Sequence, residues 1–152
     1  MRHQGFTLIE LLIALVVLAV LIGIAMPSFS NLILSQRIKA ASFDVVASLA
    51  YARSEAIKRN GSITITPVSG TNWADGWTIP DPDPSLPPLR TQAAFKNLTI
   101  SGPASIVFGR SGRIVSTAGS ILIDDSKSNA VALPRCITID TTGIPRSKSG
   151  NC

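Results

Sequence analysis

The chain has 152 residues, of which 45% are apolar and only 15% charged, and its formal net charge is +5. This length allows one small domain beside an N-terminal membrane segment, but not two such domains. The single histidine is His3, so the rest of the chain can supply no catalytic triad, histidine base or histidine-ligated metal, and we expect no enzyme, no cofactor and no metal site.

The first predicted element is an apolar segment, GFTLIELLIALVVLAVLIGIAMPS, which runs from Gly5 to Ser28. Residues 11–26 carry no charge. The 21 residues that start at Phe6 would form a helix about 31 Å long, enough to span a bilayer. Because Arg2 precedes the segment, the positive-inside rule predicts a cytoplasmic N-terminus with the rest of the chain on the other side.

Glu10 is the one residue near the start of this segment that does not suit lipid. A lone carboxylate among lipid tails costs about 3 kcal/mol and marks a partner. Three interpretations are open: a secretory signal cleaved near residues 23–25, a plain membrane anchor, or a helix whose acid meets a positive charge from another chain. The acid disfavours the first two.

The segment resembles the N-terminal signature of type IV prepilins and type II secretion pseudopilins. In that family a short basic leader, here residues 1–5, ends in glycine, a prepilin peptidase cuts after this Gly5, and the new N-terminal Phe6 is methylated. The resemblance implies that residues 6–27 first anchor the subunit in the bacterial inner membrane as a single span and later pack in a filament core. Glu10 matches the family acid that pairs with the N-terminal amine of a neighbouring subunit.

The helix is predicted to continue over residues 28–60. Pro27 lacks an N–H and should bend it, and beyond this point apolar residues follow steps of three and four. They are Ile38, Ala41, Val45, Leu49, Ala52 and Ala56. This face requires a sheet to cover it. The sequence KRNGS should end the helix, with Gly61 as a left-handed cap.

Short alternating segments, typical of strands, follow from Gly61 onward. They are SITITPV (62–68), GWTI (76–79), NLTIS (97–101), SIVFG (105–109), RIVS (113–116), SILIDD (120–125) and CITID (136–140). The proline-rich PDPDPSLPP (80–88) is predicted to be an irregular connection, and its acids lack the spacing of a calcium loop. We therefore predict an α+β fold in which a long N-terminal helix packs on an antiparallel β-sheet head formed by residues 61–152.

Several segments of the head resemble the GspH/FimT family of minor pilins and pseudopilins. They are YARSEAIKRNGSITI (51–65), NWADGWTI (72–79), IVFGRSGRI (106–114) and ITIDTTGIPRSK (137–148). The resemblance implies a periplasmic head, other pilin subunits as partners, and a structural role in priming or capping a type IV pilus. The alternatives are a minor pseudopilin of a type II protein secretion system and an ordinary exported binding domain. Trp73 and Trp77 could stack on a ligand, but packing of a loop onto the sheet is the favoured role.

Two cysteines, Cys136 and Cys152, lie near the C-terminus. They are too few for a zinc site. If the head is exported, a disulfide that tethers the C-terminal tail is a simpler interpretation than two free thiols, and closing this loop would contribute about 3 kcal/mol.

The C-terminal segment is also basic. Arg135, Arg146 and Lys148 are candidate contacts for double-stranded DNA, joined by Arg110 and Arg113 on a predicted hairpin turn if they share its face. Arginine and lysine side chains presented on a constrained loop contact phosphates without reading the bases. Solvated surface charge is the alternative.

The resemblance bears on this hypothesis. In FimT-type minor pilins a GRxR motif near the C-terminus is linked to DNA binding during natural transformation. The present chain has GIPRSK, in which Gly143 matches and Ile144 replaces the first arginine. FimU-type minor pilins also have a Gly-x-Pro-Arg ending and a C-terminal disulfide.

Overall fold

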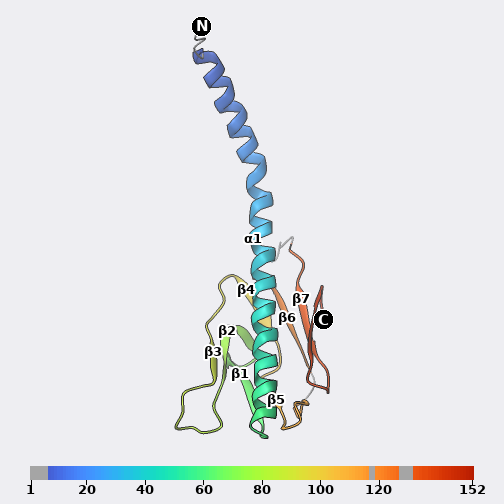
Figure 1. Ribbon diagram of the computed structural model, residues 1–152. Helices are drawn as coiled ribbons and strands as arrows, with labels where there is room; N and C mark the ends of the chain where they lie inside the picture. Colours follow the sequence, from blue (N-terminus) through green and yellow to red (C-terminus); the bar gives the residue numbers. More distant parts are fainter. Residues whose placement is uncertain (1–6, 117–118, 127–131) are drawn as a thin grey trace, which may run out of the picture.

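The molecule has a long helical stem, residues 8–33, and a β-rich head that packs on the rest of the same helix (Figure 1). The computed structural model describes residues 7–116, 119–126 and 132–152, with the backbone alone for residues 24–28. One helix, α1 (Leu8–Lys58), precedes all the strands of the described chain. These strands are β1 (Ile63–Ser69), β2 (Asn72–Ile79), β3 (Arg90–Gln92), β4 (Leu98–Ser101), β5 (Ile106–Phe108), β6 (Gly119–Asp125), β7 (Arg135–Ile139) and β8 (Pro145–Ser149).

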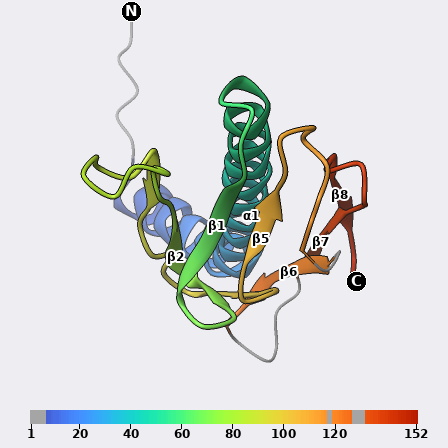
Figure 2. The same ribbon diagram turned by 90° about the horizontal axis from the view of Figure 1, so that it is seen from below.

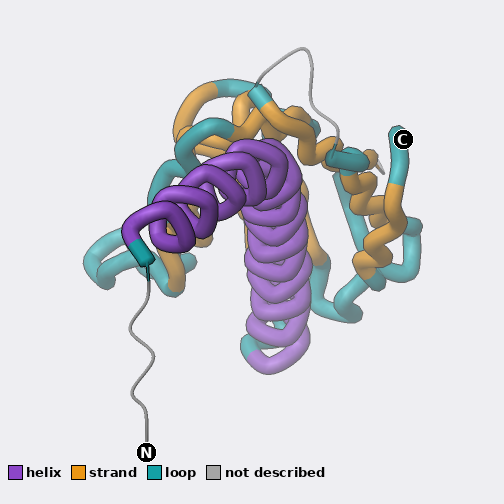
Figure 3. Tube along the Cα trace, turned by 90° about the horizontal axis from the view of Figure 1, so that it is seen from above, coloured by secondary structure: helices purple, strands orange, loops and turns teal. Residues whose placement is uncertain are grey.

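Helix α1 has 51 residues and is therefore about 77 Å long. It continues through Pro27, and its axis changes direction between the stem and the head (Figures 1 and 3). A proline inside a helix removes one backbone hydrogen bond and crowds the preceding turn, which accounts for a bend without a break.

The C-terminus of α1 has a different cap from the predicted one. Asn60, with φ of 50°, is the left-handed residue, and Gly61 follows it. The Gly61 N–H donates to the Ala56 carbonyl at 3.1 Å, and the Asn60 N–H donates to the Ile57 carbonyl at 3.2 Å. This pair of bonds is a Schellman motif, and asparagine can hold its left-handed position because its short polar side chain tolerates positive φ.

The strands form one antiparallel sheet in the order β5-β1-β2-β4-β6-β7-β8, with β3 paired to β2. Viewed along the head helix, the sheet curves around one side of α1 (Figure 2). The predicted face of α1 is confirmed: all six of its residues, from Ile38 to Ala56, are at most 1% exposed. They pack against inward-facing strand residues, among them Ile63, Ile65, Ile100, Phe108, Ile121, Ile123 and Ile137.

The α+β prediction is correct, but four details of the sheet differ from the sequence expectations. Strand β2 begins at Asn72, four residues before the predicted GWTI. RIVS makes only an isolated bridge, between Phe108 and Ile114, and one further backbone bond, from the Val115 N–H to the Val107 carbonyl. Strand β3 lies just after the proline-rich connection and had no alternating pattern to reveal it. The C-terminal tail, predicted to be a loop, forms strand β8 along the edge of the sheet.

Candidate functional site

The stem is an apolar surface without cover from the head. The large apolar side chains from Leu8 to Ile22 are 49–77% exposed. Within the described residues, no helix is both long and apolar enough to cross a membrane. Gly5 and Phe6, the predicted processing site, lie outside the described residues, so cleavage and methylation there remain predictions.

Glu10 takes part in the cap that begins α1. The Glu10 carboxylate accepts hydrogen bonds from the Thr7 backbone N–H at 2.9 Å and from the Thr7 hydroxyl at 3.0 Å. In return, the Glu10 N–H donates to the Thr7 hydroxyl oxygen at 3.3 Å. This reciprocal arrangement is a capping box, and the sequence T-x-x-E could have revealed it. Glu10 therefore has a local role in addition to the predicted contact with another subunit.

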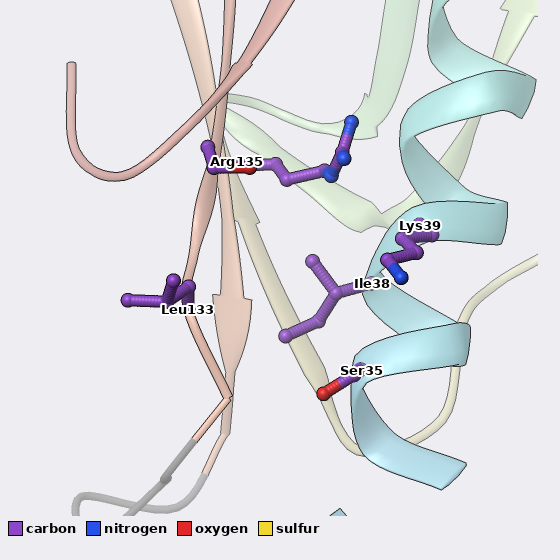
Figure 4. A pocket seen from close by; sticks show the side chains of 6 residues that line it. Ser35, Ile38, Lys39, Leu133 and Arg135 are labelled. Carbon is purple, nitrogen blue, oxygen red and sulfur yellow. The ribbon is translucent and has the colours of Figure 1, made fainter. Parts of the chain in front are cut away.

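The basic residues of the C-terminal segment lie on two faces of the sheet. Arg146 pairs with Thr138 and Lys148 with Cys136 in the β7–β8 register, so both cations point to the face away from α1, where they are exposed. The Arg135 guanidinium instead donates to the Ser147 hydroxyl at 3.1 Å on the helix side, and Figure 4 shows it extending toward α1. The three residues therefore do not form one patch.

In addition to its backbone pairing with β7, strand β8 is joined to the head through side chains on both of its faces. A disulfide joins Cys136 of β7 to Cys152 just beyond β8, as predicted. On the other face, the Ser147 hydroxyl lies 2.8 Å from the hydroxyl of Ser42, a buried residue of α1. The tail is consequently an ordered strand that presents Arg146 and Lys148 at fixed positions.

An acid lies close to this outward face. Asp140 accepts hydrogen bonds from the hydroxyl and backbone N–H of Thr142 in the turn between β7 and β8. The Thr142 hydroxyl bond is the main reason that the pKa of Asp140 lies below its ordinary value, and the positive charge of Arg146 adds to the effect. Part of the Arg146 charge is thus offset locally.

Arg110 and Arg113 flank a tight turn after β5, in which the Gly109 N–H donates to the Arg113 carbonyl at 2.9 Å. Both arginine side chains are exposed. This turn contacts the turn between β7 and β8. The Gly112 carbonyl lies so close to Gly143 that a Cβ on Gly143 would collide with it. The turn is present as predicted, although the segment after it makes only an isolated bridge, and it brings a second pair of cations to the end of the head at which β8 begins.

The two tryptophans are structural. Trp73 and Trp77 are fully buried, with ring centroids 5.6 Å apart, and the Trp73 indole N–H donates to the Pro103 carbonyl at 2.9 Å. Trp77 also stacks on Phe95 at 5.7 Å. Neither ring can reach a ligand, so their role is to pack the segments before and after β4 onto the sheet. Among the described residues no group of three histidine, cysteine or acidic side chains could hold a metal.

Two family models match the sequence. One, described as Type II transport protein GspH, covers residues 41–143, which is most of the head and its helix. The chain belongs to the GspH family. The other, the prokaryotic N-terminal methylation motif, covers residues 1–26. None of the curated proteins matches the chain significantly.

Solved structures resemble this GspH family member in fold. The type IV minor pilin FimU of Pseudomonas aeruginosa has a TM-score of 0.62 at 25% identity, over 76% of this chain and 90% of that one. A second crystal form of FimU has a TM-score of 0.59 at 26% identity, over 74% of this chain and 92% of that one. The minor pseudopilin EpsH from the type II secretion system of Vibrio cholerae has a TM-score of 0.58 at 12% identity, over 74% of this chain and 97% of that one, and shows the shared fold alone.

Proposed function

We propose that this chain is a minor type IV pilin, which primes or caps pilus assembly after processing at Gly5 and anchoring in the inner membrane by residues 6–27. The observation that supports the proposal is the uncovered apolar stem joined to the methylation motif. Burying one Leu, Ile or Val side chain stabilises a structure by about 1.5–3 kcal/mol. A dozen such side chains in the stem therefore require lipid or neighbouring helices around them.

Mass spectrometry of the mature chain tests the processing step. A prepilin retains the apolar helix, so the mature protein should begin at Phe6 and carry one added methyl group. The matched control is Gly5→Leu, which should block the cut and leave residues 1–5 attached. A mature chain that begins near residue 26 would identify an ordinary exported domain and refute the proposal.

A deletion strain separates a pilus subunit from a secretion subunit. We expect loss of this chain to reduce the pili sheared from the cell surface and to leave the secreted proteins unchanged, and the intact gene should restore the pili. The reverse pattern would establish the alternative, a minor pseudopilin of a type II secretion system. The two roles share one fold, so this measurement rather than the architecture separates them.

DNA contact is a second candidate function, supported by Arg146 and Lys148 on one exposed face of a tethered strand. Preordering the strand reduces the entropy lost on binding. Two phosphate contacts would release few counterions, so binding would be weak, independent of sequence and lost as salt increases. Arg135 does not lie on this face, and the nearby carboxylate of Asp140 reduces the positive charge of the face.

A further inference from the structure

Two shallow grooves flank α1 where it enters the head. The first, which we call the β7 groove, has a cavity volume of about 290 Å³ and lies between α1 and the start of β7, with Lys39 and Arg135 in its walls (Figure 4). The second, the β4 groove, has about 390 Å³ and lies between α1 and the connection before β4, with Arg37 and Lys96 in its walls. Each groove thus combines one cation from the helix with one from the sheet side.

These four cations have no acidic partner in the described part of the chain. Its ion pairs involve only Lys58 and Arg59, at the opposite end of the head helix. Two acids lie near the grooves. Asp125 is opposite Leu98 of the β4 groove and two residues from Ile123, the strand partner of Arg135, and Asp44 is one helical turn from Ala40 of the β4 groove. No ion pair in the described residues joins either acid to any of the four cations. Both grooves therefore carry a positive charge that an external anion could neutralise.

The apolar surface of the stem leads directly to the grooves. Between Leu8 and Arg37 the only charged residue is Glu10. Phe29, Leu32 and Ile33 are 62%, 54% and 40% exposed, so exposed apolar side chains lie within one helical turn of Arg37, about 6 Å along the axis. This spacing matches the headgroup layer that borders the hydrocarbon core on each side of a bilayer, about 5–8 Å thick.

We propose that the two grooves bind the phosphate groups of anionic phospholipids, so that the head rests on the membrane surface before the subunit enters a filament. Phe29, Leu32 and Ile33 would lie at the edge of the hydrocarbon, while Arg37 and Lys39 reach the headgroups with their charged ends. The helix from Leu8 to Ile33 is about 39 Å long, which exceeds the hydrocarbon thickness, so a tilt or the bend in α1 accommodates the excess length. This inference rests on the membrane anchoring in the proposed function.

The occupant favoured by these observations is lipid, rather than nucleic acid or an acidic protein segment. The four cations surround the helix at one level beside the apolar stem, and each cation near an anionic bilayer surface strengthens binding about fivefold. Arg146 and Lys148, which remain the DNA candidates in the proposed function, lie on the other face of the sheet.

The test uses the full chain in vesicles of phosphatidylcholine alone and of phosphatidylcholine mixed with phosphatidylglycerol. A water-soluble amine reagent labels exposed lysines, and peptide mass spectrometry gives the labelling of Lys39 and Lys96 relative to Lys58. Lys58 is the internal control because its side chain is 75% exposed at the far end of α1. We expect labelling of Lys39 and Lys96 to fall about fivefold in the anionic vesicles only. The double variant Arg37→Gln/Arg135→Gln should lose most of this protection, and the matched Arg110→Gln/Arg113→Gln should keep it.

The other outcomes separate this inference from the proposed function. Equal labelling in both kinds of vesicle would overturn the lipid site while leaving the anchored pilin intact. Protection that follows the protein-to-lipid ratio would assign the grooves to neighbouring subunits and also overturn it. Failure of the chain to float with either kind of vesicle would refute the membrane anchoring itself, and the lipid site with it.

Discussion

Gly143 lies with its backbone directly against the carbonyl group of Gly112, in a contact that leaves no room for a side chain. Gly143 belongs to the turn between β7 and β8, and Gly112 to the turn after β5, so the contact links the two edges of the curved sheet. The Arg53 side chain of α1 donates to the same Gly112 carbonyl at 3.0 Å. One carbonyl thus connects both edges and the helix at the end of the head where α1 stops.

The substitution Gly143→Ala should destabilise the head by at least about 2 kcal/mol, a size that signals a steric conflict rather than an ordinary surface change. Two causes act together: Gly143 has φ of 77°, which costs an alanine about 1 kcal/mol, and the new Cβ collides with backbone that cannot rotate away. The measurement is the free energy of unfolding in denaturant. Gly70→Ala is the matched control, because Gly70 also has positive φ, 55°, but has open space around it. Equal losses for the two variants would mean that the contact between the turns contributes nothing.

Removing the disulfide with Cys136→Ser/Cys152→Ser should lower the free energy of unfolding by about 3 kcal/mol, because the oxidised chain closes a loop of 15 intervening residues in the unfolded state. Strand β8 should respond most strongly in hydrogen exchange. It is an edge strand, and without the disulfide its side-chain hydrogen bond to α1 is the hydroxyl contact between Ser42 and Ser147. Unchanged protection of the β8 amide groups would show that backbone pairing with β7 alone holds the strand.

The sequence predicted the parts of the fold that have a strong period. The six apolar residues of the head helix repeat every three to four positions, and burial on the sheet is the only way to remove that face from water. Strand β8 escaped prediction because PRSKS has no apolar residue, although small and charged side chains alternate in it. Its position depends on pairing with β7, on the disulfide and on the contact with Ser42, none of which a pattern within PRSKS can reveal.

The division of the basic residues could not be predicted either. A shift of one residue in strand register moves every side chain to the other face, and the register of β7 with β8 is set by the turn at Gly143. Without that register, Arg135, Arg146 and Lys148 form one cluster in the sequence. In the structure they belong to two surfaces.

The loss of folding stability at acid pH, which we call the acid limb of the stability curve, should depend on Glu55. The Arg59 side chain donates to the nearly buried Glu55 carboxylate at 2.8 Å and is the main cause of its lowered pKa, and Lys58 adds to it. A carboxyl group whose pKa is lower in the folded state stabilises the fold above its ordinary pKa, 4.5, and loses this contribution as the pH falls through the lowered value. The midpoint temperature of Glu55→Gln should therefore be less sensitive to acid than that of the natural protein.

A double-mutant comparison assigns this pH dependence to the Arg59 contact. In an Arg59→Gln background, the further change Glu55→Gln should alter the acid limb much less, because the main cause of the pKa shift is already absent. Identical acid limbs for the natural protein and Glu55→Gln would refute the assignment.

DNA binding by the full chain in detergent should depend on the outward face of β8. If Arg146 and Lys148 each contact one phosphate, the logarithm of the binding constant should fall with the logarithm of salt concentration with a slope of about −1.8. Arg146→Ala/Lys148→Ala should abolish this dependence, whereas the control Arg135→Ala should leave it unchanged because Arg135 lies on the helix side. Equal effects of the control and the double variant, or no binding at low salt, would exclude this face as a DNA site.

The last prediction separates two roles of Glu10. As a capping residue it satisfies donors at the start of α1, and glutamine can do the same in a capping box. As the predicted partner of a neighbouring amine it must carry a negative charge, which glutamine lacks. Glu10→Gln should therefore preserve the beginning of the helix and still abolish incorporation into filaments.

Thr7→Ala is the matched control for that variant, because it removes the cap hydroxyl but keeps the Glu10 charge. A lost cap costs about 1 kcal/mol, too little to detach a helix that is covered by lipid or by other subunits along its length. We therefore expect Thr7→Ala to assemble at close to the normal level in a complemented deletion strain, as measured by the amount of this chain in sheared filaments. If Thr7→Ala fails while Glu10→Gln assembles, the acid acts through the helix cap, and no neighbouring positive charge is needed to explain its place in an apolar segment.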